Sequence, residues 1–269
     1  YFDITEEGNW EGNSIPRIIM KKSSLSTFLK ITEDEIVESL MLSRLKVKKY
    51  RASRIPPGTD DKVIVSWNAL MISSLAKVSY ALGKKEYFDA ADKAVTFIVE
   101  RMSRDDGTLN RVYRKNVSHI DAFAEDYSYF GNSLIDMYEA SFDSKYLELA
   151  KKYADILIDQ FYTDGQFKQS LSKNIVINSG NSMDNATPSY NFMCSLLLIR
   201  LHYYYDSKKY KEVVETSINR AGTYINQYPY AHSTALLVHH YLAKGPLEIA
   251  LVSEEIESDF TDILRNFFF

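Results

Sequence analysis

Apolar residues recur with helical spacing around three tyrosines, Tyr87, Tyr146 and Tyr210, which lie about 60 residues apart. Beyond each tyrosine, apolar residues occupy positions +4, +8, +11 and +15, and before it they occupy positions −16, −12 and −9. In the first repeat these residues are Met71, Leu75, Val78, Ala91, Val95, Ile98 and Met102. Residues at such intervals share one face of an α-helix. Each repeat therefore predicts one helix before the tyrosine, a tight turn, and a second helix after it.

The turns inside the repeats carry residues that suit helix ends. Gly83 suits a C-terminal cap, and Asp143 and Asp206 suit the N-caps of the second helices. A single hairpin of helices cannot bury its apolar face, whereas hairpins that stack against one another can. The pattern thus predicts an all-α protein built from tandem α/α hairpins.

The linkers between repeats contain turn signals. Two of them begin with an Asp-Gly pair, at Asp106-Gly107 and at Asp164-Gly165, and each pair is followed by alternating residues. Asp-Gly before an alternating segment is typical of a β-hairpin. We therefore expect short β-hairpins in the loops between the helical units.

Further elements are expected on both sides of the repeats. Thr32 and Glu35 match a capping box that opens a helix ending near Tyr50. After the third repeat, the pattern predicts helices over residues 233–242 and 256–266, with a strand over residues 247–253 between them.

The length of the chain limits the number of hairpins. With about 60 residues per repeat, 269 residues hold between about four and five hairpins, which is fewer than a closed ring of six needs. The chain begins with Tyr1 and ends on three phenylalanines, so both ends look cut. The pattern fits an open solenoid or an α/α toroid with part missing, and the cut ends favour the second. We therefore expect a single domain over residues 1–269 that forms a partial (α/α)6 toroid.

Polar and aromatic residues collect where the first helix of each repeat begins. These helices all begin at the same edge of the stack, which places their first residues in equivalent positions. The candidates are Asp61, Lys62, Trp67 and Asn68 in the first repeat, Glu125, Asp126 and Tyr127 in the second, and Asp184 and Ser189 in the third. If the hairpins bend around one axis, these residues face a shared cavity, which is the usual position of a ligand.

Carboxylates beside aromatic rings suit a carbohydrate. Aromatic rings pack against the apolar faces of sugars, and a pair of carboxyl groups can supply the acid and the base or nucleophile of glycosidic chemistry. Asp126 is expected to be ionised in a first helical turn and to act as base or nucleophile. Asp61 or Glu125 is the candidate acid, and Trp67 is the candidate stacking platform. The alternative is structural, because acidic residues commonly stabilise helix starts and Trp67 could belong to the core.

Histidine offers a different chemistry. His119 and His202 are candidates for moving a proton beside a sugar carbonyl, as an isomerase requires, although a buried and hydrogen-bonded histidine is the simpler interpretation. The spacing of histidines and carboxylates predicts no metal site, and no glycine-rich phosphate loop is present, so no cofactor is predicted. Cys194 lies in an apolar run and is expected to be a buried small hydrophobe.

Charge and hydropathy exclude other classes. The formal net charge of −4 argues against a general nucleic-acid binder, which needs a clustered basic surface. No apolar run reaches the roughly 20 residues that cross a bilayer, so no membrane partner is expected. With one cysteine in the chain, a reducing cytoplasm is the simplest compartment.

Three segments, residues 1–12, 51–72 and 125–140, resemble the helical C-terminal region of the spermatogenesis-associated thioredoxin-like protein family. The resemblance implies an α/α toroid similar to N-acylglucosamine 2-epimerases and six-hairpin glycosidases. It also implies that the thioredoxin-like domain and the first toroid hairpins are absent here. Trp10 and Glu11, from the first segment, join the candidate substrate-binding residues. Two positions depart from the family, which has glycine where Ala69 and Tyr190 stand, and Tyr190 is expected to narrow the mouth.

Three functional hypotheses remain open. The first is a carbohydrate-active or sugar-binding toroid that uses the candidates above, by analogy with the fold. The second is a non-catalytic interaction module, whose partner would be a chain that carries the missing part of the toroid. The third is a sugar epimerase or isomerase that depends on His119 or His202.

Overall fold

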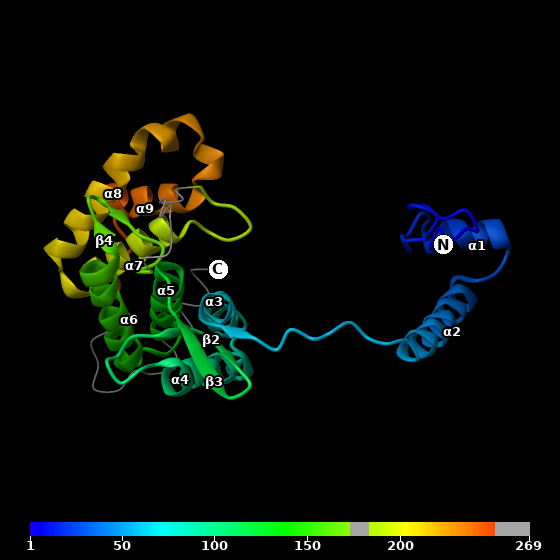
Figure 1. Cartoon of the computed structure of the whole chain (residues 1–269). Coiled ribbons are helices and arrows are strands. Elements are labelled where there is room, and N and C mark those ends of the chain that lie inside the picture. Colours follow the sequence, from blue (N-terminus) through cyan, green and yellow to red (C-terminus); the bar gives the residue numbers. More distant parts are fainter. Residues whose placement is uncertain (173–182, 251–269) are drawn as a thin grey trace. The chain divides into compact units, whose positions relative to one another are not determined.

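A computed structural model describes residues 1–172 and 183–250 of the chain, which form two compact units (Figure 1). Unit 1 covers Tyr1–Asp60 and unit 2 begins at Asp61. The helix expected over residues 256–266 lies outside the described residues, as does the end of the strand expected over residues 247–253, and residues 247–250 form no strand. The expectation of one domain over the whole chain stays a prediction.

Unit 1 contains α1 (Lys22–Leu29) and α2 (Glu33–Ala52). The predicted capping box is confirmed, because the Glu35 amide donates to Thr32 Oγ1 over 3.2 Å and the Thr32 amide donates to Glu35 Oε2 over 2.8 Å. Ile36 is the one buried side chain among residues 1–60, all of which the structure describes. Apolar residues of α2 such as Met41 and Leu45 are exposed.

Unit 2 is a double layer of helical hairpins, which confirms the predicted tandem arrangement. Its inner helices pack in the order α3, α5, α7 and α9, and α4, α6 and α8 each lie against an inner partner (Figure 1). Their bounds are α3 Val65–Leu82, α4 Lys85–Met102, α5 Ala124–Ser141, α6 Ser144–Ile156, α7 Tyr190–Tyr205, α8 Lys208–Gln227 and α9 Ser233–Lys244. A π-helical turn, η1 (Leu157–Phe161), extends α6, and a 3-10 turn, η2 (Pro229–Ala231), precedes α9.

The core lies between the two layers and matches the predicted apolar stripes with one exception. All four stripe residues that follow Tyr87 and all four that follow Tyr146 are buried. In α3, however, the expected core residues Met71 and Val78 are exposed, and Ala69, Ile72 and Ala76 are buried instead. The difference arises because, among the helices that the structure describes in unit 2, α3 has an inner neighbour on one side only, whereas α5 lies between α3 and α7. Burial around α3 therefore covers a narrower face.

The helix ends agree with the sequence at two of three positions. Gly83 caps α3 with a φ of 62°, and Asp143 caps α6 by accepting from the Lys145 amide over 3.0 Å. The assignment of Asp206 as an N-cap is wrong. Asp206 closes α7 in the left-handed region with a φ of 47°, which aspartate tolerates, and Ser207 is the N-cap of α8.

Short β-hairpins lie in the loops between the helical units, as predicted. Strands β4 (Tyr162–Thr163) and β5 (Gln166–Phe167) pair around Asp164-Gly165. A second sheet has the order β1 (Val63–Ile64), β2 (Asn110–Arg114) and β3 (Val117–Asp121).

The turn of that second hairpin differs from the prediction. Lys115 and Asn116, both at positive φ, join β2 to β3. The Asp106-Gly107 pair forms a separate turn before β2, in which the Gly107 amide donates to the Arg104 carbonyl over 2.9 Å. The pairing of β1 with β2 also places the start of α3 beside the start of α5.

None of the described helices is both long and apolar enough to cross a bilayer. Cys194 is fully buried on α7, which confirms its expected place in the core.

A tight contact between α5 and α7 gives a test of the packing. Gly131 of α5 faces Leu197 of α7, and a Cβ atom at Gly131 would lie 2.5 Å from Leu197 Cδ2. We expect Gly131→Ala to lower the unfolding free energy by about 1–3 kcal/mol through overpacking, although alanine favours a helix over glycine by about 1 kcal/mol. The matched control is Gly222→Ala in α8, where a Cβ meets no atom within 4 Å and stability should rise. A gain of stability in both variants, measured by urea denaturation, would contradict the close packing.

Candidate functional site

At the edge of unit 2 where the inner helices begin, here called the start edge, Asp126 joins two helix starts. Its side chain is fully buried. Oδ1 accepts from the Ser66 amide in the first turn of α3 over 3.0 Å, and Oδ2 accepts from the Phe123 amide before α5 over 2.9 Å. A carboxylate at this place satisfies amides that have no partner inside a helix and complements the positive helix ends.

Asp184 joins the next pair of inner helices in the same way. Oδ1 accepts from the amide of Ser189, which is the N-cap of α7, over 2.8 Å. Oδ2 accepts from the Thr234 amide in the first turn of α9, also over 2.8 Å, and the Thr234 hydroxyl donates to Oδ1. Asp126 and Asp184 thus hold the inner helices in adjacent pairs, α3 with α5 and α7 with α9.

Arg111 of β2 completes the cluster around α5. Its Nη1 lies 2.7 Å from Asp126 Oδ2, and both terminal nitrogens lie 3.3 Å from Glu125 Oε2. The guanidinium carbon also lies 4.6 Å from the centre of the Phe123 ring, within the range of a cation–π contact. Arg111 is not among the residues predicted from the sequence, where its signal was a cation in the alternating segment after Asp106-Gly107.

Glu125 and Asp126 differ in their access to solvent. Burial raises the pKa of both carboxyl groups, and the Arg111 guanidinium counteracts the rise. The Glu125 side chain keeps 16% of its surface exposed, whereas that of Asp126 keeps none. Asp126 also accepts three hydrogen bonds, which favours a structural role. Glu125 is therefore the carboxyl group of this cluster that can reach a ligand.

Asp61 lies apart from this cluster. Its half-exposed carboxylate is paired with Arg114 of β2. Arg111 and Arg114 are three residues apart on one strand, so their side chains leave opposite faces of the sheet. The structure therefore gathers Glu125 and Asp126 around Arg111 and places Asp61 on the other face. The catalytic roles of these three residues stay predictions.

The remaining candidates from the first repeat lie at the start of α3. Trp67 follows Ser66, the residue bound by Asp126, and 60% of its surface is exposed, so it lies outside the core of unit 2. Asn68 Nδ2 donates to the Ile64 carbonyl over 2.9 Å and supports its own helix start. Lys62 is exposed.

Two candidates from later repeats are buried. The Tyr127 hydroxyl accepts from the Leu109 amide over 2.9 Å, its ring packs against Tyr153 and Phe161, and burial raises its pKa to about 12. Ser189 is buried at the start of α7. The binding roles of Tyr127 and Ser189 stay predictions.

Trp10 and Glu11 lie in an exposed turn of unit 1. Their binding roles also stay predictions.

The two histidine candidates do not meet. His119 is exposed on β3, before the start of α5. His202 is half-buried in the last turn of α7, where its Nδ1 lies 3.1 Å from the Ser207 carbonyl oxygen. Within residues 1–172 and 183–250, no group of three or more His, Cys, Asp or Glu side chains is placed to hold a metal ion.

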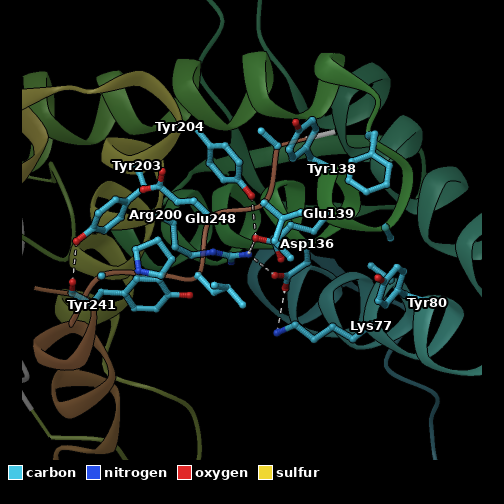
Figure 2. A pocket seen from close by; sticks show the side chains of 18 of the residues that line it. Lys77, Tyr80, Asp136, Tyr138, Glu139, Arg200, Tyr203, Tyr204, Tyr241 and Glu248 are labelled. Atoms are coloured by element: carbon cyan, nitrogen blue, oxygen red, sulfur yellow. Dashed lines mark hydrogen bonds and ion pairs between the residues drawn. The ribbon is translucent and has the colours of Figure 1, made fainter. Parts of the chain in front are cut away.

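A cavity of about 820 Å³ lies at the opposite edge, where the inner helices end (Figure 2). Its charged lining residues include Lys77, Asp136 and Arg200. This cavity was not predicted from the sequence, although these three residues all stand ten positions before the repeat tyrosines. That shared register was the available signal.

No known protein-family model matches the chain. An uncharacterised protein of Caenorhabditis elegans is 26% identical over 275 residues, which cover 94% of this chain and 37% of that protein. Human spermatogenesis-associated protein 20 is 28% identical over 229 residues, which cover 75% of this chain and 29% of that protein. The predicted resemblance is confirmed. The chain spans about a third of the length of these relatives.

Solved structures show the same architecture. Cellobiose 2-epimerase from Spirochaeta thermophila superposes with a TM-score of 0.56 over 76% of this chain and 57% of its own, at 13% identity. A sugar epimerase from a ruminal bacterium gives a TM-score of 0.50 over 59% and 43% of the two chains, at 14% identity. The helical hairpins of this chain therefore form an α/α toroid-type fold, as predicted.

The hydrogen bonds of Asp126 predict a large effect on stability. Asp126→Asn places an amide group where three donors converge and leaves Arg111 half-buried with one fewer charged partner. We expect the unfolding free energy to fall by about 3 kcal/mol, as when a buried ion pair is broken. Asp61→Asn is the matched control, because its half-exposed pair should change stability by less than about 1 kcal/mol. Equal losses in chemical denaturation would refute the anchoring role of Asp126.

The pKa of Glu125 gives a prediction about pH. Because burial raises this pKa above its value in the unfolded chain, the folded state favours the protonated form. Its contribution to stability is present below the unfolded pKa of about 4.3 and is lost as the pH rises through the folded pKa. Glu125→Gln removes this titration, so the wild type should gain stability relative to the variant as the pH falls. Unfolding at several pH values tests this, and a stability difference between wild type and variant that stays constant with pH would contradict it.

Proposed function

We propose that unit 2 binds a carbohydrate at its start edge, beside Glu125 and Trp67. The observation that carries the proposal is the arrangement around one hydrogen bond. The bond from the Ser66 amide to Asp126 joins α3 to α5, and the exposed indole of Trp67 and the partly open carboxyl of Glu125 are the next residues on either side of it. An apolar ring and a hydrogen-bonding acid are thereby held on two packed helices.

Each residue has a separate part in this proposal. Trp67 packs its ring against the apolar face of a sugar. Glu125, whose pKa burial raises, accepts a hydrogen bond from a sugar hydroxyl or donates a proton to a sugar oxygen. Asp126 acts as a positioning residue, because it fixes Arg111 and both helix starts.

The proposed activity is sugar binding, and no hydrolytic reaction is proposed. Most enzymes that hydrolyse glycosidic bonds use two carboxyl groups that both face the substrate. Asp126 is fully buried. Asp61 is paired with Arg114, whose side chain lies on the opposite face of the sheet from Arg111. The sugar epimerases with the same fold support carbohydrate as the ligand class by analogy.

Calorimetric titration with cellobiose, mannobiose and N-acetylglucosamine tests this function. We expect at least one sugar to bind in the millimolar range, and Trp67→Ala to weaken that binding at least about tenfold. Met71→Ala is the matched control, since Met71 lies one turn further along α3 and is 59% exposed against 60% for Trp67. Failure of all three sugars to bind, or unchanged binding by Trp67→Ala, would reject the proposal.

The interaction module is the second candidate function. It is favoured by the apolar residues Met41 and Leu45 on α2, which are exposed within unit 1, since exposed apolar surface often marks a contact with another surface. A partner chain that completes the toroid stays a prediction. So do the histidine-dependent epimerase and the cytoplasmic location.

A further inference from the structure

The cavity where the inner helices end lies apart from the start edge and has its own chemistry. It occupies about 820 Å³ between the last turns of α3, α5 and α7, the side of α9, and residues 245–250 (Figure 2). A volume of this size is typical of a pocket for a small molecule.

Equivalent positions of the three repeats supply the lining. Ten residues before the repeat tyrosines stand Lys77, Asp136 and Arg200, and seven residues before them stand Tyr80, Glu139 and Tyr203. Residues three apart on a helix share a face, so α3, α5 and α7 each present one residue of each set to the cavity. The cavity is therefore a product of the repeat itself.

The two cations of the lining are already neutralised. Arg200 is 8% exposed, and its Nη2 lies 2.7 Å from Asp136 Oδ1 and 2.9 Å from Glu139 Oε1. Its Nη1 donates to the Asn132 carbonyl oxygen over 3.2 Å. Lys77 Nζ lies 3.3 Å from Asp136 Oδ2. These contacts hold the cations in the wall and leave them little attraction for an anionic ligand.

Negative charge is in excess around the cavity. Asp136, Glu139 and Glu248 face two cations, Lys77 and Arg200. The Glu139 side chain is 47% exposed, and the Tyr204 hydroxyl donates to its Oε1 over 3.1 Å. The C-terminal ends of α3, α5 and α7 add partial negative charge at the same edge.

Aromatic rings surround the exposed carboxylate. Tyr138 packs edge-on against Tyr204 with ring centres 5.3 Å apart, and Tyr203 and Tyr241 lie on the far side of the cavity (Figure 2). The faces of such rings attract a cation and exclude water from it.

We infer that this cavity binds an organic cation, an amine or quaternary ammonium compound, through the Glu139 carboxylate and the surrounding tyrosine rings. Glu139 supplies the opposite charge, and the rings contact the alkyl groups around the cationic nitrogen. Asp136 and Arg200 are positioning residues, because their ion pair holds α5 and α7 at the spacing that forms the cavity.

Choline and its neutral analogue 3,3-dimethyl-1-butanol, which differ in the charge of one atom, test the inference on the full chain. Calorimetric or NMR titration should show saturable binding of choline in the millimolar range and affinity for the alcohol lower by about tenfold. Glu139→Gln, which keeps an oxygen for the Tyr204 and Arg200 contacts, should weaken choline binding by a similar factor. Glu100→Gln on the exposed face of α4 removes the same charge elsewhere and should leave binding unchanged.

Tyr80→Leu provides a second test that leaves the ion pairs in place. It should weaken choline binding while the melting temperature of the variant stays close to that of the wild type. Equal affinity for choline and the neutral alcohol, or binding that survives Glu139→Gln and Tyr80→Leu, would overturn the assignment, as would the absence of saturable choline binding. None of these outcomes depends on sugar binding at the start edge.

Discussion

Charged side chains buried among the inner helices must find partners on neighbouring inner helices, and this requirement determines the arrangement of unit 2. Asp136 of α5 is 3% exposed, and its partners are Lys77 and Ser73 on α3 and Arg200 on α7. A buried carboxylate without such partners would cost several kcal/mol, so the three helices can pack closely only in this register. At the start edge, Asp126 and Asp184 impose the same condition through backbone amides.

The same requirement divides the polar residues between structure and function. Asp126, in the first turn of α5, and Asp184, in the loop before α7, are fully engaged with the helix starts that they join. Residues next to such buried positions remain at least partly open: Glu125 precedes Asp126, Trp67 follows Ser66, and Glu139 lies one turn beyond Asp136 at the opposite edge. Each open residue is held by a buried neighbour, and this gives an exposed side chain a fixed position on a rigid element.

The helices could be predicted because their signals are local. Helical spacing, the Thr32 capping box and the Asp164-Gly165 turn each involve residues within one or two turns of one another. The exposure of Met71 could not be predicted, since it depends on which neighbours α3 has. The bond from Ser66 to Asp126 joins residues 60 positions apart, and nothing local marks it. Lys77, Asp136 and Arg200 did share a visible register, but their pairing follows only once the hairpins are adjacent.

A double-mutant cycle between Asp136 and Arg200 tests most directly whether buried charge pairing between inner helices organises unit 2. With Asp136→Asn and Arg200→Gln, singly and together, the account predicts a coupling energy above about 2 kcal/mol in the unfolding free energy. The exposed pair Lys85–Asp89 on α4, whose Nζ and Oδ1 atoms lie 2.6 Å apart, should give about 0.5 kcal/mol in the same cycle. A coupling between Asp136 and Arg200 no larger than that of the exposed pair would contradict the account.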